Sequence, residues 1–387
     1  MQAGTCSGRS SNRPETFAHS GAAEVIPATR QIWADRLSTD KLGKLALGLF
    51  IGAIGGVVAE YFHVPLAWML GPLFFCMAAS VSGIPALVPM WLRGNFMLII
   101  GLFLGESFEG MDVAAILQWP ISIAGAVLYM PIATYLAYLY YRFVVREDRM
   151  TAICSSIPGG LTAVVLISNS LGADERNVAL AQSLRIAFVV CMAPFVAFGL
   201  MGYAPPDHDL YAGQELISLP DLALLLGASV RLMYVLRNSG IPILPMICPL
   251  VVSAILRLGG VIEGVLPHWL VEVGLLVLGS SVGTRFAGIP VRRLLGFGAL
   301  TFGGTAVLMG TAALLAFVVS TVTDLELVAL LLAYAPGGVA EMSLIAFAID
   351  ADSGFVAVHH IVRIIFVMIA VPLLAAWAAR LQRTSPP

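Results

Sequence analysis

The chain has 387 residues, of which 59% are hydrophobic and 11% charged, and its formal net charge is -2. A mean hydropathy of +0.92 excludes a soluble core within a polar shell and predicts a polytopic membrane protein. No basic stripe favours contact with nucleic acid, so no nucleic-acid partner is expected.

In chain order, residues 1–41 are polar and lack the apolar core of a signal peptide, which predicts a disordered cytoplasmic tail. Membrane repeat 1 at 42–201 contains six apolar stretches, at 43–61, 66–83, 90–108, 117–141, 150–171 and 177–200. An acidic linker at 202–218 follows. Membrane repeat 2 at 219–379 contains six more, at 220–238, 241–258, 266–285, 294–318, 325–349 and 354–378. A short C-terminal tail at 380–387 ends the chain.

The fifth and sixth stretches of repeat 1 have the same sequence pattern as the fifth and sixth stretches of repeat 2. Residues 156–194 read SIPGGLTAVVLISNSLGADERNVALAQSLRIAFVVCMAP, and residues 334–372 read YAPGGVAEMSLIAFAIDADSGFVAVHHIVRIIFVMIAVP. The matching residues lie 178 positions apart, as in Pro158 and Pro336, Gly160 and Gly338, Asp174 and Asp352, Arg185 and Arg363, and Pro194 and Pro372. A repeat of this length indicates a duplicated membrane protein, whose substrate site is expected where the copies meet.

The charged loops predict that the two copies enter the membrane from opposite sides. An arginine-rich loop at 142–149 follows the fourth stretch of repeat 1, whereas one at 285–293 precedes the fourth stretch of repeat 2. Inversion requires an odd number of crossings in each copy. The fifth stretch is the best candidate for returning without crossing, because Pro-Gly-Gly breaks its helix. This gives ten crossings with both termini in the cytoplasm, whereas a re-entrant second stretch would place both termini outside.

The Pro-Gly-Gly breaks are the first candidate site. A break at membrane depth frees backbone groups that lipid cannot satisfy, so it lies against protein or lines a wet cavity. The helices restart after the breaks, and their N-terminal amides suit an anion or a polar substrate. The alternative is a kink that relieves packing strain. The predicted substrate-binding residues are Pro158, Gly159, Gly160, Thr162, Arg185, Pro336, Gly337, Gly338 and Arg363.

The two arginines of the repeated pattern lie deep in their helices. At ~1.5 Å per residue, Arg185 and Arg363 come about 13–15 Å into the membrane, where an arginine is costly unless it is paired or hydrated. They are either structural, as ion pairs or caps on broken-helix carbonyls, or they bind an anion or move with the substrate.

Two residues of repeat 2 are candidates for coupling transport to protons or a cation, because repeat 1 has a different type of residue at each equivalent position. Glu341 falls in the first turn of a restarted helix, where the helix dipole favours its charge, and Ala163 takes its place in repeat 1. His360, whose counterpart is Gln182, lies three residues before Arg363 and is either a proton relay or a hydrogen-bonding core residue. Asp174 and Asp352 are expected to be helix N-caps.

These motifs carry a family resemblance. The segments SIPGGLTAV, AYAPGGVAEMSLIA, GADERNVALAQSLRIAF and ADSGFVAVHHIVRIIF resemble the AbrB family of bacterial membrane proteins over about 45–378. The resemblance implies two labels that do not agree, regulator of gene expression and ammonia monooxygenase. A copper oxygenase needs several converging His or carboxylate ligands, yet only His359 and His360 cluster, so no metal, cofactor or enzyme activity is expected.

The interrupted helix followed by a long helix that starts at an Asp also looks like the crossover element of the bile acid–sodium symporters and the cation/proton antiporters. That likeness implies inverted repeats with crossing interrupted helices. The chain lacks the adjacent membrane aspartates of the antiporters, which leaves the substrate open.

The sequence therefore predicts an all-α polytopic membrane protein with two inverted repeats, interrupted helices and about 10–12 membrane segments. The predicted function is a multi-pass permease of the bacterial inner membrane that moves a small anionic solute by motion of one bundle against the other, coupled to protons or a cation. A membrane sensor that affects gene expression indirectly is the alternative. The expected partners are a small-molecule or ion substrate and the lipid bilayer, and a homodimer is left open.

Overall fold

The computed structural model describes residues 39–109, 117, 119–159, 161–196, 215–239, 244–349 and 351–384, without the side chains of 161–163, 166, 170 and 374–384. The predicted N-terminal tail up to residue 38 and most of the predicted linker lie outside these ranges. Residues 44–387 form one compact unit, to which the description below applies.

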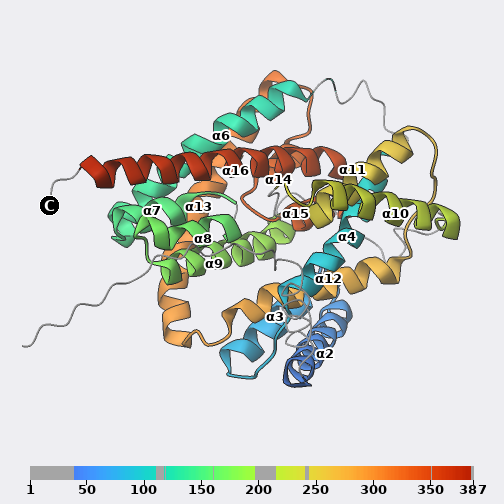
Figure 1. The fold of residues 1–387 in the computed structure, drawn as a ribbon, viewed down its shortest axis with the longest axis horizontal. Coiled ribbons are helices and arrows are strands. Elements are labelled where there is room, and N and C mark those ends of the chain that lie inside the picture. The colour runs from blue at the N-terminus through green and yellow to red at the C-terminus, as the bar shows by residue number, and fades with distance from the viewer. Residues whose placement is uncertain are drawn as a thin grey trace, which may run out of the picture. The chain divides into compact units, whose positions relative to one another are not determined.

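The regular elements of the described residues are helices, apart from one isolated bridge between Leu216 and Val265. The first half contains α2 (Thr39–Tyr61), α3 (Ala67–Val81), α4 (Met90–Glu106), α6 (Pro120–Leu139) continued by the π-helical turn η1 (Tyr140–Val145), α7 (Arg149–Ser156), α8 (Leu161–Ser168), the 3-10 turn η2 (Asn169–Leu171) and α9 (Glu175–Pro194). The second half contains α10 (Leu219–Leu236), α11 (Leu244–Leu258), α12 (His268–Gly283), the 3-10 turn η4 (Thr284–Phe286), α13 (Val291–Val322), α14 (Leu327–Tyr334), α15 (Val339–Ala348) and α16 (Ser353–Thr384) (Figure 1).

The chain is thus an all-α polytopic membrane protein, as its composition predicts. Seven of the described helices are long and apolar enough to cross a bilayer: α2, α6 with η1, α9, α10, α12 with η4, α13 and α16. The helices α3, α11 and α15 are apolar but shorter. The count of about 10–12 membrane segments and the boundaries of the two repeats stay predictions.

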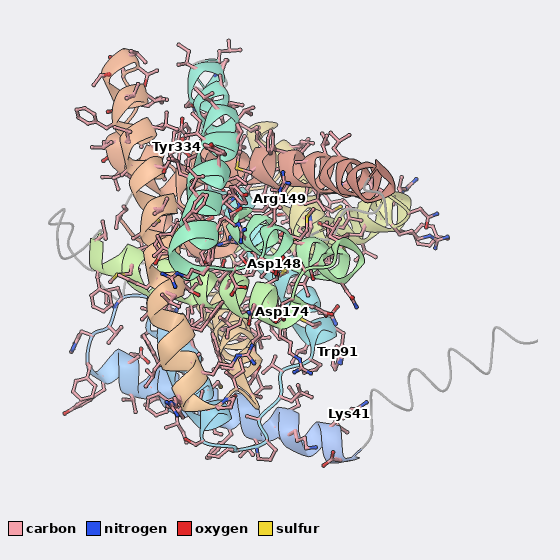
Figure 2. All side chains as sticks on the ribbon, turned by 90° about the vertical axis from the view of Figure 1, so that its left-hand side faces the viewer. Lys41, Trp91, Asp148, Arg149, Asp174 and Tyr334 are labelled. Carbon is pink, nitrogen blue, oxygen red and sulfur yellow. The ribbon has the colours of Figure 1, made fainter. Side chains whose placement is uncertain are left out.

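Equivalent helices recur at the spacing seen in the sequence. The helices α7 and α14 begin 178 positions apart, and so do α9 and α16. The helices α6 and α13, which are also equivalent, pack side by side in antiparallel orientation (Figure 2). Near one end of this pair, a Cβ on Gly125 would meet Val319, and near the other end Tyr140 Oη donates a hydrogen bond to Leu300 O at 3.0 Å. The two copies are therefore inverted, as the charged loops predict.

A glycine seam on each of the equivalent helices α4 and α12 joins the two copies. The helix α4 packs against α11 of the other copy, where a Cβ on Gly101 would collide with the Met246 carbonyl oxygen. The helix α12 packs against α3, where a Cβ on Gly279 would collide with the Met69 carbonyl oxygen. Gly101 and Gly279 lie 178 positions apart, so both copies use the same small-residue contact to bring backbones together.

Candidate functional site

The fifth stretch of the first copy folds into a hairpin, called here the first hairpin, in which α7 and α8 flank a Pro-Gly-Gly break. The helix α7 begins behind Asp148, whose side chain accepts hydrogen bonds from the backbone of Met150 and Thr151. The chain returns through α8 to the start of α9, where the Asp174 amide donates to Thr151 Oγ1 at 2.8 Å. The hairpin comes back to the level at which it entered, as predicted for this stretch, and Figure 2 shows Asp148 and Asp174 near each other at that end.

The helix α9 runs beside α7 and satisfies carbonyl groups at the tip of the first hairpin. Gln182 Nε2 donates to Cys154 O at 2.9 Å, and Arg185 Nη1 donates to Ile157 O at 2.7 Å. Arg185 Nη2 also donates to Gln182 Oε1 at 2.6 Å. These carbonyls lie where the break ends α7 and removes their helical partners. Gln182 and Arg185 therefore cap the first half of the interrupted helix.

The second hairpin, formed by α14 and α15, is capped in the same way by α16. His360 Nε2 donates to Leu332 O at 3.0 Å, while Arg363 donates through Nη1 to Ala335 O at 2.5 Å and through Nη2 to Gly337 O at 2.5 Å. Leu332 and Ala335 lie 178 positions after the carbonyls that α9 caps. Both arginines therefore cap broken-helix carbonyls, as one of the two alternatives expects, and their role in substrate binding stays a prediction.

The tips of the two hairpins each contact the arginine-bearing helix of the other copy. A Cβ on Gly159 would lie 3.8 Å from Val367 Cγ2 and 3.7 Å from Arg363 Nε. A Cβ on Gly337 would lie 3.0 Å from Val189 Cγ1. Gly159 has φ +113°, a conformation that side chains disfavour. The Pro-Gly-Gly breaks thus lie close to each other across the boundary between the copies.

Two buried N–H donors are left over where the hairpin tips meet. The Nε atoms of Arg185 and Arg363 have no hydrogen-bond partner among the described residues, although the side chains are only 3% and 5% exposed. The two guanidinium groups lie close enough for their charges to interact, and Tyr129 of α6 lies near both. Tyr129 stacks on Tyr334 at the end of α14, with 6.2 Å between ring centroids. A buried region that has unused positively charged donors suits an anion.

Glu341 occupies the first turn of α15, directly behind the second break. A Cβ on Gly338 would collide with its carboxylate, so the side chain folds back over the N-terminus of its own helix. This position satisfies the helix dipole. Glu341 is 3% exposed, and its charge lies within reach of three guanidinium groups, those of Arg93, Arg285 and Arg363.

The other predicted residues fall in or beside the hairpins. Pro158 and Pro336 lie in the two tips, whereas Gly160 and the side chain of Thr162 are outside the described residues. Asp174 and Asp352 are N-caps as predicted, since each carboxylate accepts backbone N–H groups of the helix that follows. No group of three or more His, Cys, Asp or Glu side chains in the described part of the chain is placed to hold a metal ion.

Sequence reasoning missed the charged residues that come from other elements. Arg93 lies near the start of α4 and Arg285 in η4, and neither is part of the repeated motif. The position of Arg285 in a loop indicated only the orientation of the chain in the membrane. Tyr129 carried no signal, because one tyrosine in an apolar helix is ordinary.

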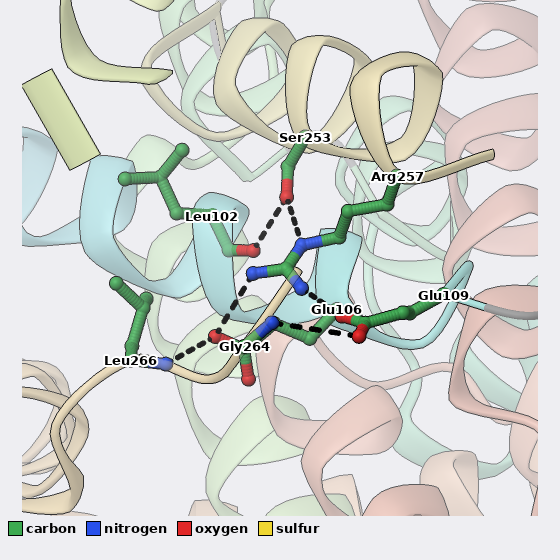
Figure 3. A network of polar contacts seen from close by, with 7 residues as sticks. All are labelled: Leu102, Glu106, Glu109, Ser253, Arg257, Gly264 and Leu266. Carbon is green, nitrogen blue, oxygen red and sulfur yellow. Dashed lines mark hydrogen bonds and ion pairs between the residues drawn. The ribbon is translucent and has the colours of Figure 1, made fainter. Parts of the chain in front are cut away.

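A second buried charge network lies at the other end of α4 (Figure 3). Arg257 of α11 pairs with Glu109 and lies 3.7 Å from Glu106 Oε1. Its Nε donates to Ser253 Oγ at 3.2 Å, and Glu106 Oε1 accepts the Leu266 amide at 2.7 Å. This network links helices of the two copies and balances the Arg257 charge, in contrast to the excess of arginine around Glu341.

The family model described as Transition state regulatory protein AbrB matches residues 68–379, which include both hairpins, α9 and most of α16. The chain belongs to this family. A relative from Bacillus subtilis (strain 168), named "Uncharacterized protein YhjN", is 28% identical over 358 residues, covering 83% of this chain and 90% of the relative. "Putative regulator AbrB" of Escherichia coli (strain K12) is 25% identical over 319 residues, covering 81% of this chain and 90% of that protein. The AbrB resemblance seen in the sequence is thus confirmed over most of the chain.

Proposed function

We propose that this protein is a secondary permease for a small anionic solute and not an enzyme. The observation that carries the proposal is the charge balance at the hairpins. Among the described residues, three guanidinium groups lie within reach of the Glu341 carboxylate, and Arg185 adds a further positive charge nearby. Buried charge of one sign is costly inside a membrane, and a bound anion reduces that cost.

The inverted hairpins support transport in particular. Inverted repeats of interrupted helices are typical of secondary transporters, whose substrate sites lie at the repeat interface. Here the interface offers the unpartnered Nε atoms of Arg185 and Arg363. Because the other guanidinium nitrogens already bind carbonyls, we assign the anion to the Nε edges.

Coupling is assigned to Glu341 rather than to His360. In the first copy Gln182 makes the same carbonyl contact as His360, so this contact does not require a titrating group. Glu341 replaces an alanine of the other copy, Ala163, and its negative charge opposes the surrounding arginines. If a proton or a cation neutralised Glu341, the surrounding arginines would bind an anion more tightly. Binding of the anion and of the proton or cation would then be thermodynamically linked, as coupled transport requires.

Flux in proteoliposomes tests the proposal. Purified full-length protein is expected to move at least one member of a broad panel of carboxylates and inorganic anions, with a rate that depends on a pH or cation gradient. Glu341→Gln is expected to leave exchange of the solute but to remove the gradient dependence. Arg231→Ala, on the exposed face of α10, is the control and is expected to keep full flux.

Absence of flux for every anion and cation of the panel, from protein that is folded, contradicts the permease. If Arg363→Ala keeps full flux, the arginine is removed from the mechanism while the permease stands.

The family and relative names favour one alternative, a membrane protein that affects gene expression. The alternative rests on those names alone. Transcript profiling of a deletion strain, compared with flux in vesicles, separates the two functions, because regulation without flux favours the sensor.

A further inference from the structure

A basic cavity lies away from the hairpin tips, between the beginning of α9 and the turn from η4 into α13. Its volume is about 360 Å³. Arg176, Leu180 and Ser183 line it from α9, and Arg285 and Arg293 line it from the other copy. Because positions 176, 180 and 183 recur at helical spacing, they present one face of α9 to the cavity.

The lining contains three arginines and no carboxylate. Arg293 is held in place, since its Nη2 donates to Asn177 Oδ1 at 2.7 Å. Asn177 in turn donates to Glu147 at 3.0 Å, and the Glu147 charge partly balances Arg293. The guanidinium groups of Arg176 and Arg285 form no hydrogen bond or ion pair of their own with the described residues. The cavity therefore has two guanidinium groups without a hydrogen bond, of which Arg285 also lies within reach of Glu341, and a third, Arg293, that is partly balanced.

We propose that this cavity binds a small oxyanion with two negative charges, either a dicarboxylate or a phosphate group. Guanidinium groups bind such anions through paired N–H donors, and the Ser183 hydroxyl offers one more donor. The volume falls at the lower end of the range for small-molecule pockets, which suits a ligand of this size. The site shares no residue with the hairpin tips, and its binding can be measured without transport.

The cavity lies on the arginine-rich side of the molecule. Arg293 of the second copy and Glu147, which lies in the basic loop of the first, meet at Asn177, so the two basic loops are on one side. The positive-inside rule assigns this side to the cytoplasm. Arg285 is the link to the centre, since it lines the cavity and also lies within reach of Glu341.

Binding to the purified full-length protein in detergent tests the site. Isothermal titration calorimetry uses inorganic phosphate and, separately, succinate as probes, at about pH 8, where a phosphate group carries about two charges. At least one probe is expected to bind saturably. Arg176→Ala is expected to weaken binding about tenfold, because it removes a charged donor, and Arg176→Glu to abolish it. Arg176 is exposed, so these variants are expected to fold, and Arg231→Ala is the control that should bind like the wild type.

Nanodiscs distinguish a free anion from a lipid headgroup. If discs that contain phosphatidic acid reduce phosphate binding relative to discs of phosphatidylcholine alone, and Arg176→Ala removes this effect, the ligand is the lipid phosphate. If phosphate binding is equal in both discs, the ligand is soluble. Lack of saturable binding by phosphate, succinate and phosphatidic acid overturns the proposal, and so does binding that Arg176→Ala and Arg176→Glu leave unchanged. Neither result bears on solute flux.

Discussion

Replacement of His360 by glutamine separates a structural role from a titrating one. His360 is fully buried, and its Nε2 donates to Leu332 O, the position at which Gln182 serves the first hairpin. A glutamine amide has the same donor, so His360→Gln is expected to change the free energy of unfolding by less than about 0.5 kcal/mol. His360→Leu keeps the apolar bulk but leaves the carbonyl without a donor.

The size of the leucine effect follows from that single lost contact. An unsatisfied buried backbone group costs about 1–3 kcal/mol, whereas hydrogen bonds within membrane proteins contribute about 0.6 kcal/mol on average and about 1.7 at most. We therefore expect His360→Leu to lower the free energy of unfolding by about 1–2 kcal/mol. Gln182→Leu removes donors from both Cys154 O and Ile157 O and an acceptor from Arg185, so it is expected to cost more.

Denaturant unfolding in detergent, followed by tryptophan fluorescence, measures these differences, and flux at several pH values accompanies it. If His360→Gln lost as much stability as His360→Leu, the equivalence of His360 and Gln182 would be wrong. If it kept stability but lost the pH dependence of flux, His360 would be a proton carrier and the assignment of coupling to Glu341 would fail.

Three further substitutions test the packing around the site, each by unfolding in detergent. Gly101→Ala is expected to destabilise by about 1–3 kcal/mol because its Cβ enters the neighbouring backbone, whereas Gly94→Ala on the same helix meets no atom within 4 Å and should be neutral or stabilising; equal effects would refute the tight seam. Arg257→Met leaves the buried Glu106 carboxylate without its cation and is expected to cost about 3–5 kcal/mol, against less than about 1 for Glu109→Gln, whose side chain is 38% exposed; the reverse order would contradict the network. Asp174→Ala removes an N-cap and should cost about 1 kcal/mol, while Asp174→Asn should retain most of the stability.

Local pattern was enough to predict the hairpins and the N-caps, because each depends on residues close in sequence, and the inversion followed from comparing the charged loops of the two copies. Pro-Gly-Gly breaks a helix wherever it occurs, and an aspartate before a helix caps it by itself. The partners of Arg185 and Arg363 were left open, since depth in the membrane does not say which carbonyl lies 28 residues away. The repeat nevertheless gave a usable signal for the contact between Arg185 and Ile157, because both residues have counterparts 178 positions later, Arg363 and Ala335.

Contacts between the copies could not be predicted in the same way. Arg93 meets the charge of Glu341 only because α4 crosses from the first copy into the second. Gly101 and Gly279 lie at the repeat spacing, which was a usable signal, but their partners Met246 and Met69 follow from the way the helices interlock. A single sequence does not fix such tertiary pairings.

The location of the caps determines what a movement between the copies would disrupt. Each hairpin is capped by a helix of its own copy, so a hairpin and its arginine travel as one rigid piece. Where each tip meets the helix of the other copy, Gly159 lies against Val367 and the Nε edge of Arg363, and Gly337 lies against Val189. Sliding one tip past the other therefore leaves the capping hydrogen bonds within each copy intact, whereas the hydrogen bond from Tyr334 Oη to Ser122 O, which joins the second hairpin to α6 of the first copy, would have to break.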